Sequence, residues 1–174
     1  LSARLFDPTV RTVTVDLAGI SYMDSAGVLT LIRLDEWGRA RGRVQRYLNV
    51  PPEVRKVMDL IDRVERRIAR LLNWPIENGE GMQVLHYRPG AEYKPHYDYF
   101  APNEPGTPTI LKRGGQRVGT LVMYLNEPAR GGATTFPDVG LQVVPRRGNA
   151  VFFSYNQPDP ATKTLHGGAP VLEG

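Results

Sequence analysis

The sequence predicts an α+β fold in which a β-α-β-α segment precedes a half made of strands and turns. Before residue 61, alternating apolar residues and apolar stripes of helical spacing follow one another, which indicates strands and helices in turn. After residue 74, most of the 18 glycines and 15 prolines separate short apolar runs. Several short strands at such spacing are typical of a barrel or sandwich.

In the first segment, residues 13–17 alternate apolar and polar side chains, as a strand does. Residues 24–27 (DSAG) precede an apolar stripe over 28–34 that predicts a helix. Residues 44–50 form a second candidate strand, and a helix opens at 51–53 (PPE), since proline is tolerated in a first turn. This order implies a parallel strand pair with a right-handed crossover.

The second half contains four candidate strands, within 82–87, 118–125, 141–144 and 150–155. The stretch 101–116 is too long for an ordinary hairpin turn, and loops of that length are more often functional or disordered. Helical spacing continues through the junction at about 60–74, so a helix rather than a flexible linker is expected there. We predict domains at 1–61 and 62–174.

The composition excludes several classes of protein and of functional site. No apolar run approaches the roughly 18 residues that cross a bilayer, and no signal-peptide order opens the chain, so we expect a cytoplasmic protein with no membrane partner. The absence of cysteine excludes disulfides, thiolate metal sites and cysteine nucleophiles. Any metal must therefore be held by nitrogen and oxygen, and the three histidines limit the choice.

The charge is unevenly distributed along the chain. The formal net charge is +4, and its excess lies in the first 70 residues, much of it as arginine. A nucleic-acid or acidic-partner surface is one interpretation. Carboxylates are interleaved with these arginines, however, and this favours solvated helix faces over nucleic-acid binding.

His96 and Asp98 carry the strongest chemical signal. Residues two apart on a strand point to the same face, so this imidazole and this carboxylate converge. The pair alone is a weak signal, and His166 is the candidate third ligand. Two histidines and one carboxylate, with open positions opposite, form the facial triad of non-haem Fe(II) oxygenases. The third histidine, His86, is expected to be a packed or solvent-facing side chain.

Residues 62–174 resemble the catalytic domain of prolyl 4-hydroxylases, which are Fe(II)- and 2-oxoglutarate-dependent dioxygenases. The resemblance is carried by ordered blocks that include GAEYKPHYDYF at 90–100, GGATTFP at 131–137 and LHGGAPV at 165–171. The other matching blocks are 77–80, 83–87, 116–126 and 148–153.

The resemblance implies a double-stranded β-helix (jelly roll) that hydroxylates proline in a peptide or protein, with Fe(II), 2-oxoglutarate, O₂ and ascorbate. His96, Asp98 and His166 match the ligand positions. Tyr87 and Thr120 match the contacts to 2-oxoglutarate, although each has a simpler interpretation as a packing or strand residue.

Three further features follow from the resemblance. Tyr93 and Arg117 fall where similar enzymes touch the peptide, and the loop 101–116 matches the segment that folds over it. A lysine that pairs with the far carboxylate of 2-oxoglutarate would fall at position 176. The family's last strand is therefore expected to be missing from residues 62–174.

Residues 11–61 resemble the second half of a STAS domain, the fold of anti-sigma-factor antagonists. The resemblance is carried by VTVDLAGISYMDSAG at 13–27, GRV at 42–44 and VPPEVRKV at 50–57. It implies a protein partner and phosphorylation at Ser25. The simpler interpretation, which we favour, is that Ser25 is a helix N-cap.

Two incomplete domains in one chain suggest a recombined or engineered chimera, in which strands of one part cover edges of the other. The leading functional hypothesis is a prolyl 4-hydroxylase-like dioxygenase. The alternative is a non-catalytic chimera, or a STAS-type binding module whose oxygenase part is vestigial.

Overall fold

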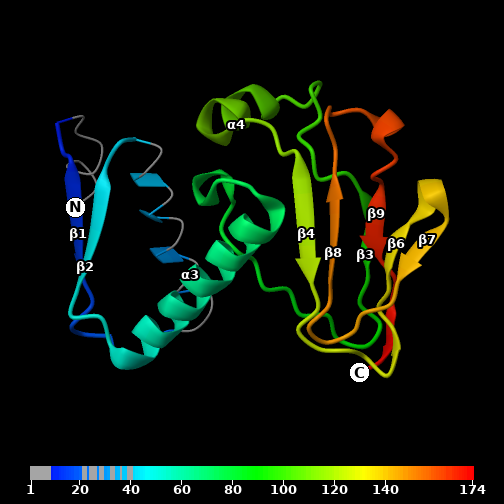
Figure 1. The fold of residues 1–174 in the computed structure, drawn as a ribbon, viewed down its shortest axis with the longest axis horizontal. Coiled ribbons are helices and arrows are strands. Elements are labelled where there is room, and N and C mark those ends of the chain that lie inside the picture. Colours follow the sequence, from blue (N-terminus) through cyan, green and yellow to red (C-terminus); the bar gives the residue numbers. More distant parts are fainter. Residues whose placement is uncertain are drawn as a thin grey trace. The chain divides into compact units, whose positions relative to one another are not determined.

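The computed structural model describes residues 9–20, 23, 27, 30–31, 34–35, 37–38 and 41–174 (Figure 1). Contacts between backbone positions divide the chain into two compact units, Leu1–Val84 and Leu85–Gly174. Among the described residues, no helix is both long and apolar enough to cross a membrane. The predicted boundary after residue 61 stays a prediction.

The first unit contains the predicted parallel strand pair. β1 (Thr12–Asp16) lies beside β2 (Val44–Leu48) in parallel, with Thr12 opposite Val44 (Figure 1). The residues described at 27, 30–31, 34–35 and 37–38 are helical, as expected between the strands. Side chains of β2 bind the carbonyls of this helical segment: Tyr47 Oη donates to Leu31 O at 3.0 Å.

The core of the first unit is aliphatic. Leu17, Leu31 and Val54 are buried at its centre, where each removes an apolar side chain from water. The partly buried side chains that surround them are Val15, Ile20, Met23, Tyr47, Val50 and Met58.

Helix α3 (Pro52–Leu72) passes through the predicted junction without a break, which confirms that a helix occupies it. It begins with proline at its first turn and Glu53 beside the positive end of its dipole. It ends at Asn73, whose left-handed backbone (φ 51°) lets the chain turn into the 3₁₀ helix η1 (Ile76–Asn78).

The second unit is strand-rich and antiparallel. Its largest sheet has four strands in the order β3-β9-β6-β7, and two further sheets pair β4 with β8 and β5 with β10 (Figure 1). The strands are β3 (Tyr93–His96), β4 (Gly119–Met123), β5 (Arg130–Gly131), β6 (Thr134–Phe136), β7 (Leu141–Val143), β8 (Ala150–Ser154), β9 (His166–Gly168) and β10 (Val171–Glu173). The short helices are α4 (Thr107–Gly114), η2 (Pro137–Val139) and η3 (Pro160–Thr162).

Three of the four predicted strands form, as β4, β7 and β8. The prediction of a strand within 82–87 is wrong. Residues 82–87 belong to no ladder, and Val84 and Leu85 are more than half exposed. A short apolar run does not by itself provide a neighbouring strand, and an unpaired segment has no ladder hydrogen bonds to hold it as a strand. The loop 101–116 also differs from the expectation, because α4 forms within it.

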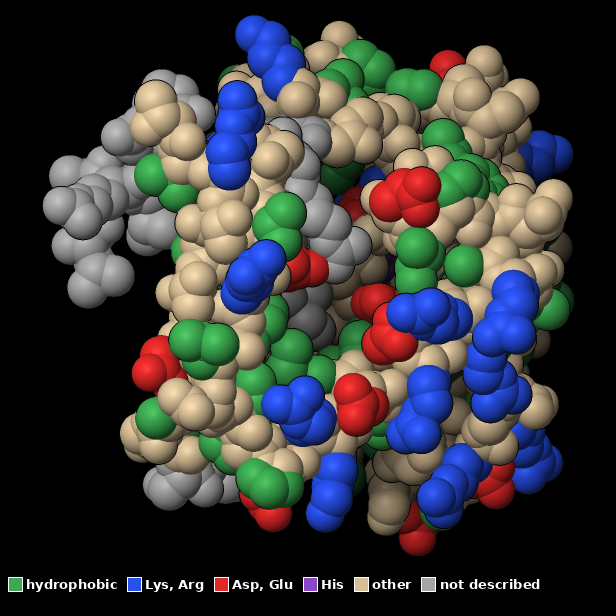
Figure 2. All heavy atoms as spheres, turned by 60° about the vertical axis from the view of Figure 1, so that its left-hand side comes forward, with side chains coloured by type: hydrophobic (Ala, Val, Ile, Leu, Met, Phe, Trp, Pro, Cys, Tyr) green, Lys and Arg blue, Asp and Glu red, His purple; other side chains and the backbone are tan. Residues whose placement is uncertain are grey.

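The interior of the second unit is aromatic and polar. Tyr99, Tyr124, Phe136 and Tyr155 are buried there with Thr134, Thr164 and His166. Larger apolar side chains reach the surface in both units, and Figure 2 shows hydrophobic side chains among charges of both signs on the face in view.

Candidate metal centre

The pairing of β3 with β9 brings the two candidate histidine ligands together. In this antiparallel register His96 lies directly opposite His166, although 70 positions separate them. Opposite residues of an antiparallel pair project from the same face with their Cβ atoms about 5 Å apart. The two imidazole rings accordingly lie with their centroids 4.5 Å apart.

Gly167 allows the two strands to approach this closely. A Cβ atom at this position would lie 2.7 Å from Tyr93 O and 3.0 Å from Pro95 N, both of which are backbone atoms. The absence of a side chain is therefore what permits the packing of β9 against β3 next to His166.

Asp98 completes the cluster from just beyond the end of β3. The strand ends at His96 rather than continuing through residue 98, since Pro95 has no N–H for the ladder and the register shifts there. The carboxylate still faces both rings. His96 Nε2 lies 3.3 Å from Asp98 Oδ1, and His166 Nε2 lies 3.4 Å from Asp98 Oδ2.

The three side chains fit one metal ion. Their ligand atoms all lie within 4.8 Å of one another, and they form the metal-binding group found among the described residues. Two ligands about 2.1 Å from an ion and at right angles would lie about 3.0 Å apart. Each distance from a histidine Nε2 to an Asp98 oxygen would therefore shorten by a few tenths of an ångström around an ion, and the wider separations in the group, up to 4.8 Å, would shorten by more.

Both histidines are oriented in the same way by the backbone. His96 Nδ1 lies 2.9 Å from Lys94 O, and His166 Nδ1 lies 3.0 Å from Thr164 O, so each ring meets the carbonyl two residues earlier. A carbonyl accepts only, so each Nδ1 must be the protonated nitrogen. Nε2 is then the ring nitrogen whose electron pair would bind a metal.

Aromatic rings enclose one side of the cluster. Phe153 lies 4.6 Å from the His166 ring, and Phe136 lies 6.0 Å from it, both measured between centroids. The His166 side chain is only 7% exposed, whereas the His96 side chain is 27% exposed. The centre is therefore dry behind His166 and open beside His96.

Tyr87 and Tyr93 lie on the open side. The Tyr93 ring lies 4.2 Å from the His96 ring and 6.5 Å from the Tyr87 ring, both between centroids. Burial, and secondarily the neighbouring Tyr93, raise the pKa of Tyr87, so its phenol stays a neutral hydrogen-bond donor. Their assigned contacts, 2-oxoglutarate for Tyr87 and peptide for Tyr93, stay predictions.

Thr120, the second predicted 2-oxoglutarate contact, binds a candidate metal ligand in this structure. Thr120 Oγ1 donates to Asp98 Oδ2 at 2.7 Å and lies 3.1 Å from Tyr155 Oη. Tyr155 was not expected from the sequence. Its signal was available, since it continues the inward face of β8 two residues after Phe153, and a buried tyrosine hydroxyl needs a partner.

Gln116 and Arg117, at the end of the loop 101–116, form hydrogen bonds with the backbone just before the loop begins. Arg117 Nη1 donates to Asp98 O at 3.1 Å, and its guanidinium lies 4.6 Å from the centre of the Phe100 ring. The Gln116 side chain binds both backbone groups of Phe100, at 2.8 and 2.9 Å. Arg117 thus lies against the backbone of a candidate ligand, while its predicted peptide contact stays untested.

Two other expected positions lie away from the centre. His86 falls in the unpaired stretch before Tyr87 and is exposed, in keeping with the simpler interpretation. Ser25 lies outside the described residues.

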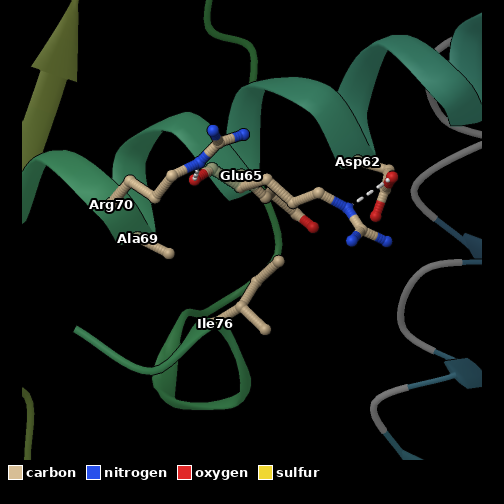
Figure 3. A pocket seen from close by; sticks show the side chains of 6 residues that line it. Asp62, Glu65, Ala69, Arg70 and Ile76 are labelled. Atoms are coloured by element: carbon tan, nitrogen blue, oxygen red, sulfur yellow. Dashed lines mark hydrogen bonds and ion pairs between the residues drawn. The ribbon is translucent and has the colours of Figure 1, made fainter. Parts of the chain in front are cut away.

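A hollow in the first unit is lined by no residue of the triad. It has a volume of about 570 Å³ and is lined by residues of α3 together with Ile76 (Figure 3). Two of its lining side chains already pair with each other, Arg66 Nε with Asp62 Oδ2 at 2.9 Å. The side chains that line it are those of an ordinary solvent-exposed helix face, so it is not a candidate catalytic or metal site.

Residues 82–174 match the family model of the 2OG-Fe(II) oxygenase superfamily. The chain belongs to this superfamily. Residues 1–66 match the STAS domain model. Both resemblances inferred from the sequence are thereby confirmed.

Curated relatives from Arabidopsis thaliana include prolyl 4-hydroxylase 5, which is 39% identical over 137 residues and matches 67% of this chain and 45% of its own length. Prolyl 4-hydroxylase 1 is 41% identical over 138 residues, covering 70% of this chain and 46% of the relative. The chain thus spans about half the length of the curated relatives it matches. A truncated form of the viral collagen prolyl hydroxylase from Paramecium Bursaria Chlorella virus-1 has a TM-score of 0.49 and 30% identity, covering 66% of this chain and 62% of that one.

Proposed function

We propose that residues 85–174 are the Fe(II)- and 2-oxoglutarate-binding part of a dioxygenase that hydroxylates prolyl residues in a peptide or protein. The observation that carries the proposal is the convergence of His96, Asp98 and His166 within 4.8 Å, with both Nε2 atoms turned toward one carboxylate. The kinship with prolyl 4-hydroxylases supports proline as the acceptor.

The proposal includes the finer fold, a double-stranded β-helix. The antiparallel sheet order β3-β9-β6-β7, in which distant strands become neighbours, and the separate β4–β8 pair support it. In such a barrel the triad lies at one open end, with His166 on an inner strand and Asp98 just after another.

When bound, Fe(II) with 2-oxoglutarate and O₂ supplies the chemistry that replaces a C–H bond by C–OH, with succinate and CO₂ as coproducts. The protein's own part is to hold and orient. The carbonyls of Lys94 and Thr164 fix the protons of both histidines on Nδ1, and Phe136 and Phe153 exclude water behind His166.

The open side of the centre is assigned to the substrates. Tyr87 as a neutral donor suits the carboxylate of 2-oxoglutarate, and Tyr93, which is 49% exposed beside His96, suits contact with a peptide. Ascorbate is expected to keep the iron ferrous between turnovers.

The deciding experiment supplies the full chain with Fe(II), ascorbate, 2-oxoglutarate and a proline-rich peptide. We expect succinate release coupled to a gain of one oxygen atom in the peptide by mass spectrometry, and neither product with His166→Ala. Succinate without peptide oxidation would leave a 2-oxoglutarate oxygenase but refute proline as the acceptor. Absence of both products, alongside metal binding, would favour the alternative of a vestigial oxygenase part.

A second function is proposed for the first unit because residues 1–66 match the STAS domain. The resemblance to STAS segments implies a protein partner and phosphorylation at Ser25, and the alternative is that Ser25 serves only as a helix N-cap. The test is phosphorylation of Ser25 by a serine kinase preparation, read by mass spectrometry, with Ser25→Ala as control. Equal labelling of both chains would refute this position.

A further inference from the structure

The hydroxyl of Tyr155 belongs to a chain of hydrogen bonds that ends on a candidate metal ligand. Tyr155 is 3% exposed, and its Oη lies 3.1 Å from Thr120 Oγ1. Thr120 Oγ1 in turn donates to Asp98 Oδ2 at 2.7 Å. Three side chains from three segments, at β8, β4 and the end of β3, are thus connected through their oxygen atoms.

The direction of the chain follows from the proton count. A threonine hydroxyl has one proton to donate. Since the carboxylate can only accept, that proton points to Asp98, and Thr120 can meet Tyr155 only as an acceptor. Tyr155 is therefore the donor, and its bond prevents the Thr120 hydroxyl from turning its proton away from Asp98.

The strand register explains why these two hydroxyls meet. Thr120 lies opposite Phe153 in the β4–β8 pair, and Tyr155 follows two residues later, with its N–H donating to Val118 O at 3.0 Å. Diagonal neighbours of an antiparallel pair are within reach of a long aromatic side chain. Phe153 packs against the His166 ring, and Tyr155, two residues later on the same side of the chain, donates a hydrogen bond to Thr120.

We propose that Tyr155 is a positioning residue for the metal centre: through Thr120 it fixes the Asp98 carboxylate in the orientation that faces both His96 and His166. This inference rests on the metal site of the proposed function. It concerns how that site is held, whichever substrate is oxidised. A hydrogen bond that ends on an ionised acceptor is among the stronger ones, and linked hydrogen bonds strengthen one another.

The test measures binding of Co²⁺ alone, an air-stable divalent substitute for Fe(II), to the full chain by calorimetry and by its visible absorption. Thr120→Val removes the direct donor and is expected to weaken Co²⁺ binding about 10- to 100-fold, as is usual for a hydrogen-bond partner of a metal ligand. Tyr155→Phe keeps the ring and is expected to weaken binding measurably but less than Thr120→Val does, with a changed Co²⁺ spectrum, because Tyr155 bonds the ligand only through Thr120.

The double variant distinguishes positioning from packing. If Tyr155 acts through Thr120, the double variant Thr120→Val with Tyr155→Phe binds Co²⁺ no more weakly than Thr120→Val alone. Losses that multiply would overturn the proposal. The matched control is Tyr124→Phe, which removes another buried tyrosine–threonine hydrogen bond, to Thr134 at 2.8 Å, and should leave Co²⁺ binding unchanged.

The remaining outcomes separate the two proposals. Unchanged affinity and spectrum in Tyr155→Phe, with strong binding by the parent chain, would overturn this inference and leave the proposed function standing. No Co²⁺ binding by the folded parent chain would overturn the metal site and this inference together.

Discussion

The two units of this chain bury different kinds of side chain. The first is built around Leu17, Leu31 and Val54, whose only contribution is apolar surface removed from water. The second buries Tyr155 and His166 among other aromatic and hydroxyl side chains, and these groups bond one another at defined distances.

This difference separates a scaffold from a site. Aliphatic packing is non-directional, so it tolerates small shifts at a modest energetic cost. A hydrogen-bonded polar interior depends on angles and distances, and a half-satisfied network is costly. The second unit is therefore where the removal of one atom should change metal chemistry, and the aliphatic core of the first unit is where it should change stability.

The largest expected effect comes from removing a ligand. His166→Ala should weaken Co²⁺ binding by at least about 100-fold, beyond the usual loss of a partner that only bonds a ligand. Calorimetry measures the affinity, and circular dichroism checks that the chain stays folded. The control is His86→Ala, which removes the exposed histidine and should leave the affinity unchanged. Equal losses in the two variants would contradict the triad.

The next effect addresses the scaffold. Leu17 is 3% exposed, so Leu17→Ala should lower the free energy of unfolding of the first unit by about 3 kcal/mol through lost burial and a residual cavity. Urea titration followed by circular dichroism measures it. Leu60→Ala, at a leucine that is 54% exposed, should cost less than about 0.5 kcal/mol. In native conditions both variants should keep the Co²⁺ affinity of the parent, and a loss confined to Leu17→Ala would show that the units are not independent.

A third variant tests the close approach of β3 and β9. Gly167→Ala places a methyl group 2.7 Å from Tyr93 O, so it should destabilise the second unit by about 2 kcal/mol and weaken Co²⁺ binding by shifting His166. Gly168→Ala is the matched control, because its methyl group would meet Tyr93 Cβ at 3.5 Å, an ordinary contact. Similar midpoints in urea for the two variants would refute the steric argument.

Much of the site could be predicted because its residue types are rare in this chain. With no cysteine and three histidines, few nitrogen ligands were available, and His96 with Asp98 carried a recognisable spacing. His166 was the candidate third ligand by its residue type, and the resemblance to a family supported it. The register that sets His96 opposite His166 is a long-range pairing that no local pattern predicts.

Other features could not be predicted because they depend on partners far along the chain. Residues 82–87 form a short, mostly apolar run like those of the other strands, yet no ladder partner exists for them among the described residues. Thr120 was expected either to contact 2-oxoglutarate or to be an ordinary strand residue. Its bond to Asp98 could not be predicted, because it requires β4 to lie near the end of β3. Local patterns predicted β1, β2 and α3 correctly, because the apolar face of each of these elements packs into the core of the first unit.

The smallest effect expected is a pH dependence confined to the first unit. A hydrogen bond from Asn49, and then one from the Ala18 N–H, hold the pKa of Asp16 below its ordinary value of 3.8. A carboxyl whose pKa is depressed on folding favours the folded state above its unfolded pKa, and this contribution fades as pH falls through the folded pKa. Asn49→Gly keeps the left-handed backbone (φ 51°) and removes the amide, so it should flatten the fall in urea midpoint below about pH 4. Urea titrations of both chains from pH 6 to pH 2 measure this. An unchanged slope would assign the acid sensitivity of the first unit to carboxylates other than Asp16.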